Sequence, residues 1–197
     1  MEYKLIRLFP TTIFSTYYEK DFTVEKKYIE DLEYQLNGEN FRTKDTYLFK
    51  HKTLKNIKKF CLKSLNEYLK IVLHSEQRLG ITQCWVNKNP RGTGHSTHIH
   101  PNSVLSGVFY FNSSSPILFA KDTNTTGLRI FSTKITELNY LTFLVNPLAG
   151  VLLLFPSNTV HSVPLNTKEE MRYSLSFNTF PTDIIGNREA LTECIIN

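Results

Sequence analysis

Between Gly80 and Phe180 the sequence is a series of short strand-like segments with no helical pattern between them. Some alternate in polarity, as Gly80–Asn87 does, and others are apolar throughout, as Gly150–Pro156 is. Both patterns are typical of strands. Many short strands at close spacing favour an antiparallel sandwich or barrel of the jelly-roll type. The remaining segments are His98–Phe111, Ile117–Ala120, Leu128–Phe131, Leu141–Val145, Thr159–Leu165 and Met171–Phe180.

The part of the chain before this region predicts helices. Apolar residues recur at steps of three and four from Thr53 to Leu73, with lysines on the other face, which is the pattern of an amphipathic helix. A second helix is predicted over Thr23–Leu36, ended by an Asn-Gly pair, and a strand interrupted by proline over Leu5–Tyr18. We therefore expect a mainly β fold with N-terminal helices packed on one outer face.

The domain organisation follows from length. A chain of 197 residues is long enough for one domain with a sizeable core and short for two. We expect a single domain over residues 1–197. It would comprise an N-terminal strand and supporting helices (1–78), a β core (79–182) and a C-terminal tail (183–197).

Charge and cysteine content exclude several classes of protein. The net charge is +5, from 23 basic and 18 acidic side chains, and it is spread along the chain rather than clustered as in a nucleic-acid-binding surface. Cys61, Cys84 and Cys194 form neither a disulfide framework nor a CxxC metal site. The chain also lacks an N-terminal apolar segment and any run of membrane-spanning length. We expect a soluble protein of the reducing cytoplasm, with no membrane or nucleic-acid partner.

A pair of histidines marks the candidate metal site. His98 and His100 precede a strand-like stretch that runs to Phe111. Alternate residues of a strand share a face, so a strand over His98–Phe111 would present both imidazoles on one side, with Tyr110 in line behind them. Neutral imidazole is the commonest protein ligand for iron, copper, zinc or nickel. The pair predicts a metal site that needs a third ligand, whereas His95 is predicted to lie in a loop.

The last two predicted strands contain a third candidate metal ligand and a candidate anion-binding arginine. His161 offers a third imidazole, and eleven positions later Arg172, Ser174 and Ser176 share one face of an alternating strand. A buried guanidinium and its neighbouring hydroxyls are costly unless an anion satisfies them. The guanidinium fork matches a carboxylate in a bidentate manner. These residue types predict a metal beside a carboxylate ligand.

The pattern His98-x-His100, then His161, then Arg172-x-Ser174 resembles the superfamily of 2-oxoglutarate- and iron(II)-dependent oxygenases. Within it, residues 98–110 and 155–163 are similar to a branch of uncharacterised, prolyl-hydroxylase-like proteins found in marine bacteria and phages. The resemblance implies a double-stranded β-helix (jelly roll, cupin-like) with iron at one open end. It also implies hydroxylation of an unidentified substrate, at a prolyl or other amino-acid C–H bond, with conversion of 2-oxoglutarate to succinate and CO2.

The resemblance also assigns the metal ligands. His98 and His161 match the two metal histidines of the superfamily, and His100 stands where the pattern has an aspartate. These three histidines form the catalytic set that the resemblance implies. Three neutral imidazoles leave a divalent metal with one more positive charge than two imidazoles and a carboxylate do. The sequence therefore leaves open whether the site holds iron, zinc or nickel.

The cofactor residues follow in the same way. Arg172 and Ser174 match the pair that binds the distal carboxylate of 2-oxoglutarate, and Tyr110 is placed to add its hydroxyl. Asn87, on the preceding strand, is expected to line the cofactor pocket. The implied small-molecule partners are 2-oxoglutarate and dioxygen.

Two other classes of protein remain compatible with the residues. One is a cupin-like metalloenzyme with a three-histidine site that does not use 2-oxoglutarate. The other is a non-catalytic jelly-roll binding module whose histidines are structural. The spacing of the arginine strand from His161 favours the oxygenase.

Overall fold

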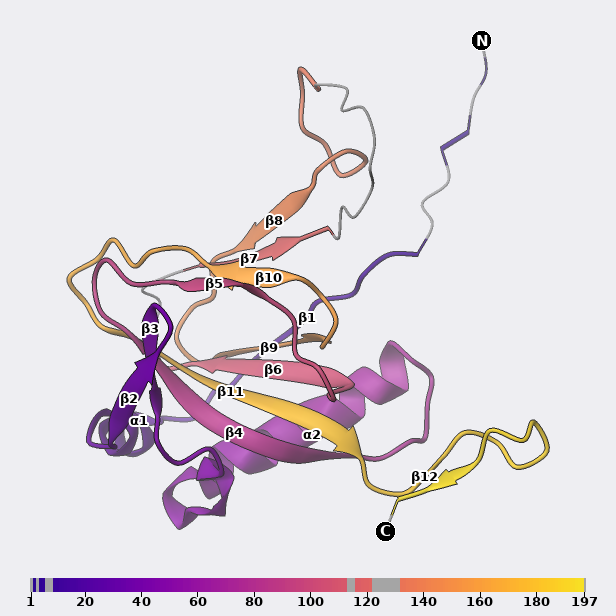
Figure 1. Ribbon diagram of the computed structural model, residues 1–197, viewed down its shortest axis with the longest axis horizontal. Helices are drawn as coiled ribbons and strands as arrows, with labels where there is room; N and C mark the ends of the chain where they lie inside the picture. Colours follow the sequence, from indigo (N-terminus) through magenta and orange to yellow (C-terminus); the bar gives the residue numbers. More distant parts are fainter. Residues whose placement is uncertain (1, 3, 6–8, 113–115, 122–131, 197) are drawn as a thin grey trace.

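The computed structural model describes residues 2, 4–5, 9–112, 116–121 and 132–196, and within them two antiparallel sheets lie one above the other (Figure 1). The larger sheet contains β1 (Phe14–Tyr17), β2 (Tyr34–Asn37), β3 (Asn40–Thr43), β4 (Leu79–Asn89), β6 (Leu105–Tyr110), β9 (Val151–Pro156) and β11 (Arg172–Pro181). The smaller contains β5 (His95–His98), β7 (Ile117–Ala120), β8 (Thr142–Val145) and β10 (His161–Val163).

The order of the strands defines the fold. The larger sheet runs β1-β9-β6-β11-β4-β3-β2 and the smaller runs β5-β10-β7-β8. From β4 to β11 the chain passes back and forth between the two sheets, so strands close in sequence lie in opposite layers. This arrangement is the predicted double-stranded β-helix, and the predicted fold class is confirmed.

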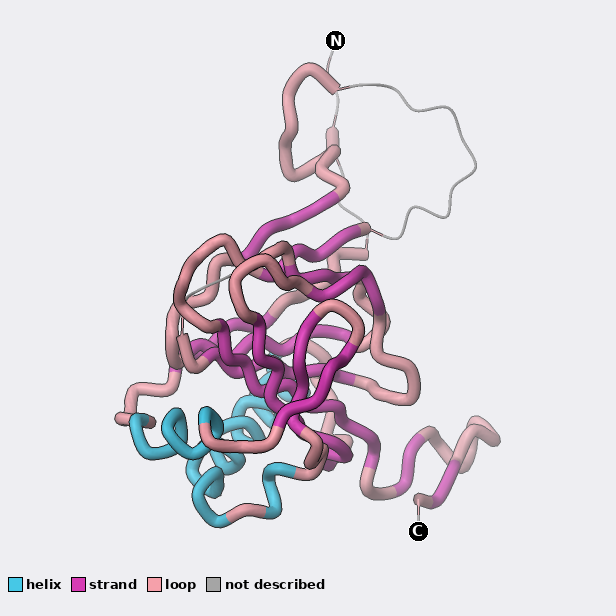
Figure 2. The backbone as a smooth tube through the Cα atoms, turned by 60° about the vertical axis from the view of Figure 1, so that its left-hand side comes forward, coloured by secondary structure: helices cyan, strands magenta, loops and turns pink. Residues whose placement is uncertain are grey.

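Two helices cover the outer face of the larger sheet, as predicted. Helix α2 (Lys55–Ile71) buries a stripe of residues that includes Ile57, Cys61 and Leu65, and α1 (Thr23–Glu30) buries Ile29 beside it. These side chains share one apolar cluster with the outward-facing residues of β6, β9 and β11. Figure 2 shows both helices on the same side of the strands. The large apolar area that is buried there stabilises the sheet that carries the site.

Between the two sheets lies a second, smaller cluster. It contains the inward-facing residues of the strands, Val108, Tyr110, Ile117, Phe119, Leu153 and Phe155. Side chains of β6 therefore point alternately to its two faces, as the sequence predicts. Phe109 lies in the outer cluster, and Val108 and Tyr110 lie in the inner one. The side chains next to the candidate site thus project from a packed strand.

Close packing in the outer cluster depends on a glycine. Gly107 on β6 pairs with Phe177 on β11, and the aromatic ring lies over the glycine. A Cβ atom at Gly107 would lie 2.1 Å from Cζ of Phe177, well inside van der Waals contact. Any side chain here would have to displace a fully buried ring.

The helix predicted over Thr23–Leu36 ends early. Residues 34–37 instead form β2, which makes a hairpin with β3. Gly38 begins the two-residue turn with φ of +64°, a conformation that favours glycine. The Asn-Gly pair therefore leads from β2 into a hairpin turn and does not end a helix, and the hairpin extends the larger sheet through the pairing of β3 with β4.

The strand predicted over His98–Phe111 is broken. β5 ends at His98 and β6 begins at Leu105, with a turn between them. Pro101 cannot donate a hydrogen bond to a sheet, and Asn102 has φ of +56°, which extended strands do not contain. The predicted strand at Leu128–Phe131 lies outside the described residues.

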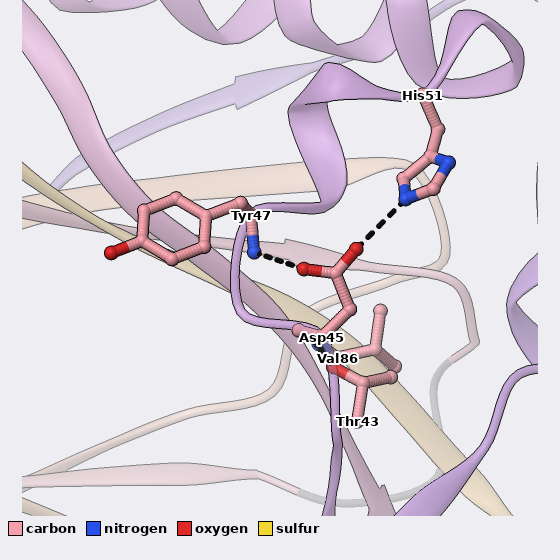
Figure 3. A network of polar contacts seen from close by, with 5 residues as sticks. All are labelled: Thr43, Asp45, Tyr47, His51 and Val86. Carbon is pink, nitrogen blue, oxygen red and sulfur yellow. Dashed lines mark hydrogen bonds and ion pairs between the residues drawn. The ribbon is translucent and has the colours of Figure 1, made fainter.

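The start of the helical region is anchored by polar contacts (Figure 3). Asp45 accepts hydrogen bonds from the Tyr47 main chain at 2.7 Å and from His51 Nε2 at 2.8 Å. Thr43 accepts from the main-chain N–H of Val86 at 3.2 Å and so joins β3 to β4. His51 therefore has a structural partner away from the candidate metal site.

The C-terminal tail forms a separate small hairpin of β12 (Ile184–Ile185) and β13 (Cys194–Ile195), visible beyond β11 in Figure 1. Among the described residues, no helix combines the length and the apolar character that a membrane-spanning helix needs.

Candidate metal centre and anion pocket

Three histidines converge between the two sheets. His98 ends β5, His161 begins the neighbouring β10, and the two residues are paired across the strands. His100 follows two residues after β5 ends and turns back towards them. One ring nitrogen from each of the three lies within 4.8 Å of the others. The structure thus brings together the three predicted ligands, although His100 lies in the turn and not on a strand.

The tautomers of two of these rings are set by the main chain. His98 Nδ1 lies 2.7 Å from the carbonyl oxygen of Ser96, and His161 Nδ1 lies 2.9 Å from that of Thr159. A carbonyl oxygen only accepts, so each Nδ1 carries the proton and each neutral ring keeps a lone pair on Nε2. Metal-binding histidines are oriented in this way.

The protein environment favours the neutral form of two of the imidazoles, those of His100 and His161. Burial lowers the pKa of His161 to about 4, and burial with the neighbouring imidazoles lowers that of His100 to about 3. His100 Nε2 and His161 Nε2 are 3.3 Å apart. A shared cation, or a proton on His100 Nε2, would remove the repulsion between their lone pairs. Among the described residues, this cluster of three histidines includes no carboxylate. A donor set of three imidazole nitrogens fits a divalent transition metal.

An arginine lies buried in the same pocket. Arg172, at the start of β11, is 2% exposed, and its guanidinium donates to Asn89 Oδ1 at 3.0 Å. No ion pair between described residues includes it. Burial lowers its pKa, which reflects the cost of keeping this charge away from water. A buried and unpaired guanidinium calls for an anionic ligand.

Three buried polar atoms around this arginine have no hydrogen-bond partner among the described residues: Arg172 Nε, Ser174 Oγ and Tyr110 Oη. The register explains why they gather, because Ser174 of β11 pairs with Tyr110 of β6 on one side and with Asn87 of β4 on the other. Burial raises the pKa of the Tyr110 phenol, which therefore stays protonated and able to donate. A carboxylate would accept from all three atoms.

Asn87 lines the pocket, but its side chain already has partners. Its amide donates to Ser176 Oγ at 2.9 Å and its oxygen accepts from Asn40 at 3.4 Å. Trp85 also lines the pocket, with its ring centroid 6.1 Å from that of His100. The histidines and Arg172 line the same pocket, so a ligand of Arg172 lies next to the metal position.

His95 is one of two site residues that the sequence did not reveal. It begins β5 rather than lying in a loop, lines the pocket, and has its ring centroid 4.3 Å from that of His98. Strand alternation did not predict this because His95 and His98 are an odd number of positions apart. Asn89, the partner of Arg172, was also missed. Its place directly opposite Arg172 follows from the pairing of β4 with β11, which sequence alone does not provide.

A family model described as "Putative 2OG-Fe(II) oxygenase" matches residues 83–178, from β4 to β11. Residues 83–178 therefore match the 2-oxoglutarate- and iron(II)-dependent oxygenases. This match does not favour the two alternatives, a metalloenzyme that makes no use of 2-oxoglutarate and a non-catalytic binding module.

Solved structures of this class share the fold. HygX from Streptomyces hygroscopicus, with nickel, 2-oxoglutarate and hygromycin B bound, is 11% identical, with a TM-score of 0.64 over 87% of this chain and 84% of its own. A Pseudomonas putida prolyl-4-hydroxylase is 15% identical, with a TM-score of 0.55 over 84% and 91%. A Trichoplax adhaerens prolyl hydroxylase in complex with a peptide fragment is 17% identical, with a TM-score of 0.57 over 86% and 83%. No curated protein sequence matches the chain.

Proposed function

We propose that His98, His100 and His161 hold iron(II), and that Arg172 and Ser174 bind the distal carboxylate of 2-oxoglutarate. One observation carries the proposal: a buried arginine, with no acidic partner among the described residues, lines the same pocket as three imidazoles. The imidazoles suit a transition metal, and the arginine suits the carboxylate of a ligand held beside it.

Tyr110 and Asn87 complete the proposed cofactor pocket in different ways. Tyr110 Oη is buried, has no hydrogen-bond partner in the described part of the chain, and donates to the same carboxylate. Asn87 is bonded to Ser176 and Asn40 and shapes the wall of the pocket. Asn89 accepts from Arg172 while remaining uncharged, so it orients the guanidinium and leaves its charge for the ligand.

When bound, iron and 2-oxoglutarate supply the oxidising chemistry, in which dioxygen, 2-oxoglutarate and a C–H bond yield an alcohol, succinate and CO2. The residues of this chain contribute geometry and exclusion of water. The main-chain carbonyls of Ser96 and Thr159 hold two imidazoles with Nε2 towards the metal position. Val108 and Ile117 line the pocket and keep it partly apolar.

The proposed prime substrate is an amino acid, either free or within a peptide, which is oxidised at a prolyl or other C–H bond. The fold similarity to two prolyl hydroxylases supports this choice, as does the resemblance of residues 98–110 to prolyl-hydroxylase-like proteins. We also propose a cytoplasmic location, supported by three free cysteines, Cys61, Cys84 and Cys194.

Succinate formation tests the proposed function. The purified protein, incubated with iron(II), 2-oxoglutarate, dioxygen and a library of free amino acids and proline-containing peptides, should release succinate faster with a true substrate than without one. The same incubation with His161→Ala is the control. Succinate release at the rate of a protein-free blank, with metal bound, would point instead to a three-histidine metalloenzyme that does not use 2-oxoglutarate.

A further inference from the structure

His100 is the one proposed ligand that no strand carries. It lies on the segment 99–104, which joins β5 to β6. Its main-chain N–H donates to the carbonyl oxygen of Ser157 at 2.9 Å. Sheet hydrogen bonds fix His98 and His161, so the position of the third imidazole depends on how this segment is held.

Ser157 is the centre of the contacts that hold it. The residue follows directly after β9 and is 1% exposed. Its hydroxyl donates to Ser103 Oγ at 2.7 Å and lies 2.8 Å from Ser106 Oγ, while its N–H donates to the carbonyl oxygen of Val104 at 3.1 Å. Ser157 thus contacts the His100 segment through its carbonyl, its N–H and its hydroxyl.

The other side of the segment is attached to β11. Ser103 Oγ accepts from the Thr179 N–H at 3.1 Å and donates to the carbonyl oxygen of Leu105 at 3.0 Å. The N–H of Val104 donates to the carbonyl oxygen of Thr179 at 3.0 Å. Ser103 therefore links Ser157 to a strand of the larger sheet, and a buried network of this kind is rigid when every member has its partners.

We propose that Ser157 is a positioning residue that fixes His100 at the metal site through Ser103, an inference that rests on the proposed three-histidine metal site. Ser157 also lies four residues before His161, in the turn that leads from β9 to β10. One buried serine therefore couples the loop ligand, which stands in place of a carboxylate, to a ligand on a strand.

Metal affinity tests the role without use of enzyme activity. Cobalt(II) affinity is measured by competition with a chromogenic chelator for the full chain, Ser157→Ala, His100→Ala and the double variant. We expect Ser157→Ala to weaken binding about 10- to 100-fold, the range for residues that orient metal ligands. In the His100→Ala background, the same change should have no further effect, because the ligand that Ser157 positions is gone.

Two controls separate positioning from loss of structure. Ser64→Ala removes another buried serine hydroxyl, which donates to the Phe60 carbonyl on α2, and should leave cobalt affinity unchanged. The cobalt(II) ligand-field spectrum of Ser157→Ala should shift towards that of His100→Ala. Ser103→Ala removes the same hydrogen bond between the Ser157 and Ser103 hydroxyls and should weaken cobalt(II) binding to a similar extent. This variant serves as the test if Ser157→Ala does not fold.

The outcomes distinguish this inference from the proposed function. Equal weakening by Ser157→Ala in both backgrounds would mean a general structural effect and would overturn the inference. Wild-type affinity in Ser157→Ala, together with a loss in His100→Ala, would overturn it and leave the metal site standing. A wild-type protein that binds no cobalt(II) would overturn the proposed site itself.

Discussion

Replacement of Arg172 by methionine should separate 2-oxoglutarate binding from metal binding. Methionine keeps much of the side-chain volume and removes the buried charge, which has no acidic partner among the described residues. The metal-free protein should therefore unfold at the same temperature as the wild type or at a higher one, because burial of an unpaired charge is costly.

The loss of affinity for 2-oxoglutarate can be estimated from the structure. Removal of one partner from a buried, hydrogen-bonded charge pair costs about 2–5 kcal/mol. At about 1.4 kcal/mol per factor of ten, the dissociation constant should rise roughly 30-fold to several thousand-fold. Arg172→Lys should give an intermediate loss, because an ammonium group keeps the charge without the bidentate fork.

Calorimetric titration of the metal-loaded protein with 2-oxoglutarate, under anaerobic conditions, measures this change. Arg78→Met is the matched control, since Arg78 is an exposed arginine 4.0 Å from Asp183 and should not affect binding. Metal content should be unchanged in both variants. An Arg172→Met protein with wild-type affinity for 2-oxoglutarate, or one that has lost its metal, would refute the assigned role.

Three further results are expected. His161→Ala should lower the affinity for iron(II) by more than about 100-fold, the upper end of the range for residues that only orient metal ligands. The measurement is the amount of metal bound per chain, and full retention of metal would exclude His161 as a ligand. Gly107→Ala should destabilise the protein by about 1–3 kcal/mol in urea unfolding, because its Cβ would meet the Phe177 ring at 2.1 Å, and an unchanged midpoint would contradict that packing. Zinc(II) at about 100 times its dissociation constant should add about 2.7 kcal/mol of stability, a rise in melting temperature of about 5–10 °C, which a chelator should reverse and His161→Ala should abolish.

Much of the site could be predicted from strand alternation and residue chemistry. The face shared by Arg172, Ser174 and Ser176 follows from a period of two, and these residues do line the pocket. The parity of the strand predicted over His98–Phe111 also placed Tyr110 on the inner face, where the structure has it in the cluster between the two sheets. The division of the chain into residues 1–78, 79–182 and 183–197 stays a prediction.

The predictions that failed concern contacts between segments that are distant in the sequence. The hairpin of β2 and β3 replaces a predicted helical end because β3 pairs with β4, a contact distant in sequence. His100 reaches the metal position from a turn, and its support from Ser157 joins residues that are 57 positions apart. Alternation assigns faces within one strand, but it does not identify which neighbouring strand supplies a partner such as Asn89.

We propose that one pocket holds iron(II) on three histidines and 2-oxoglutarate on Arg172. The most direct test is an anaerobic titration with iron(II) and then 2-oxoglutarate, followed by absorption spectroscopy. We expect the metal-to-ligand charge-transfer band of an iron(II)–keto acid complex, with saturation at one 2-oxoglutarate per chain and loss of the band at the same concentration in Arg172→Met. Iron(II) binding without this band at saturating 2-oxoglutarate would exclude a shared pocket for iron(II) and 2-oxoglutarate.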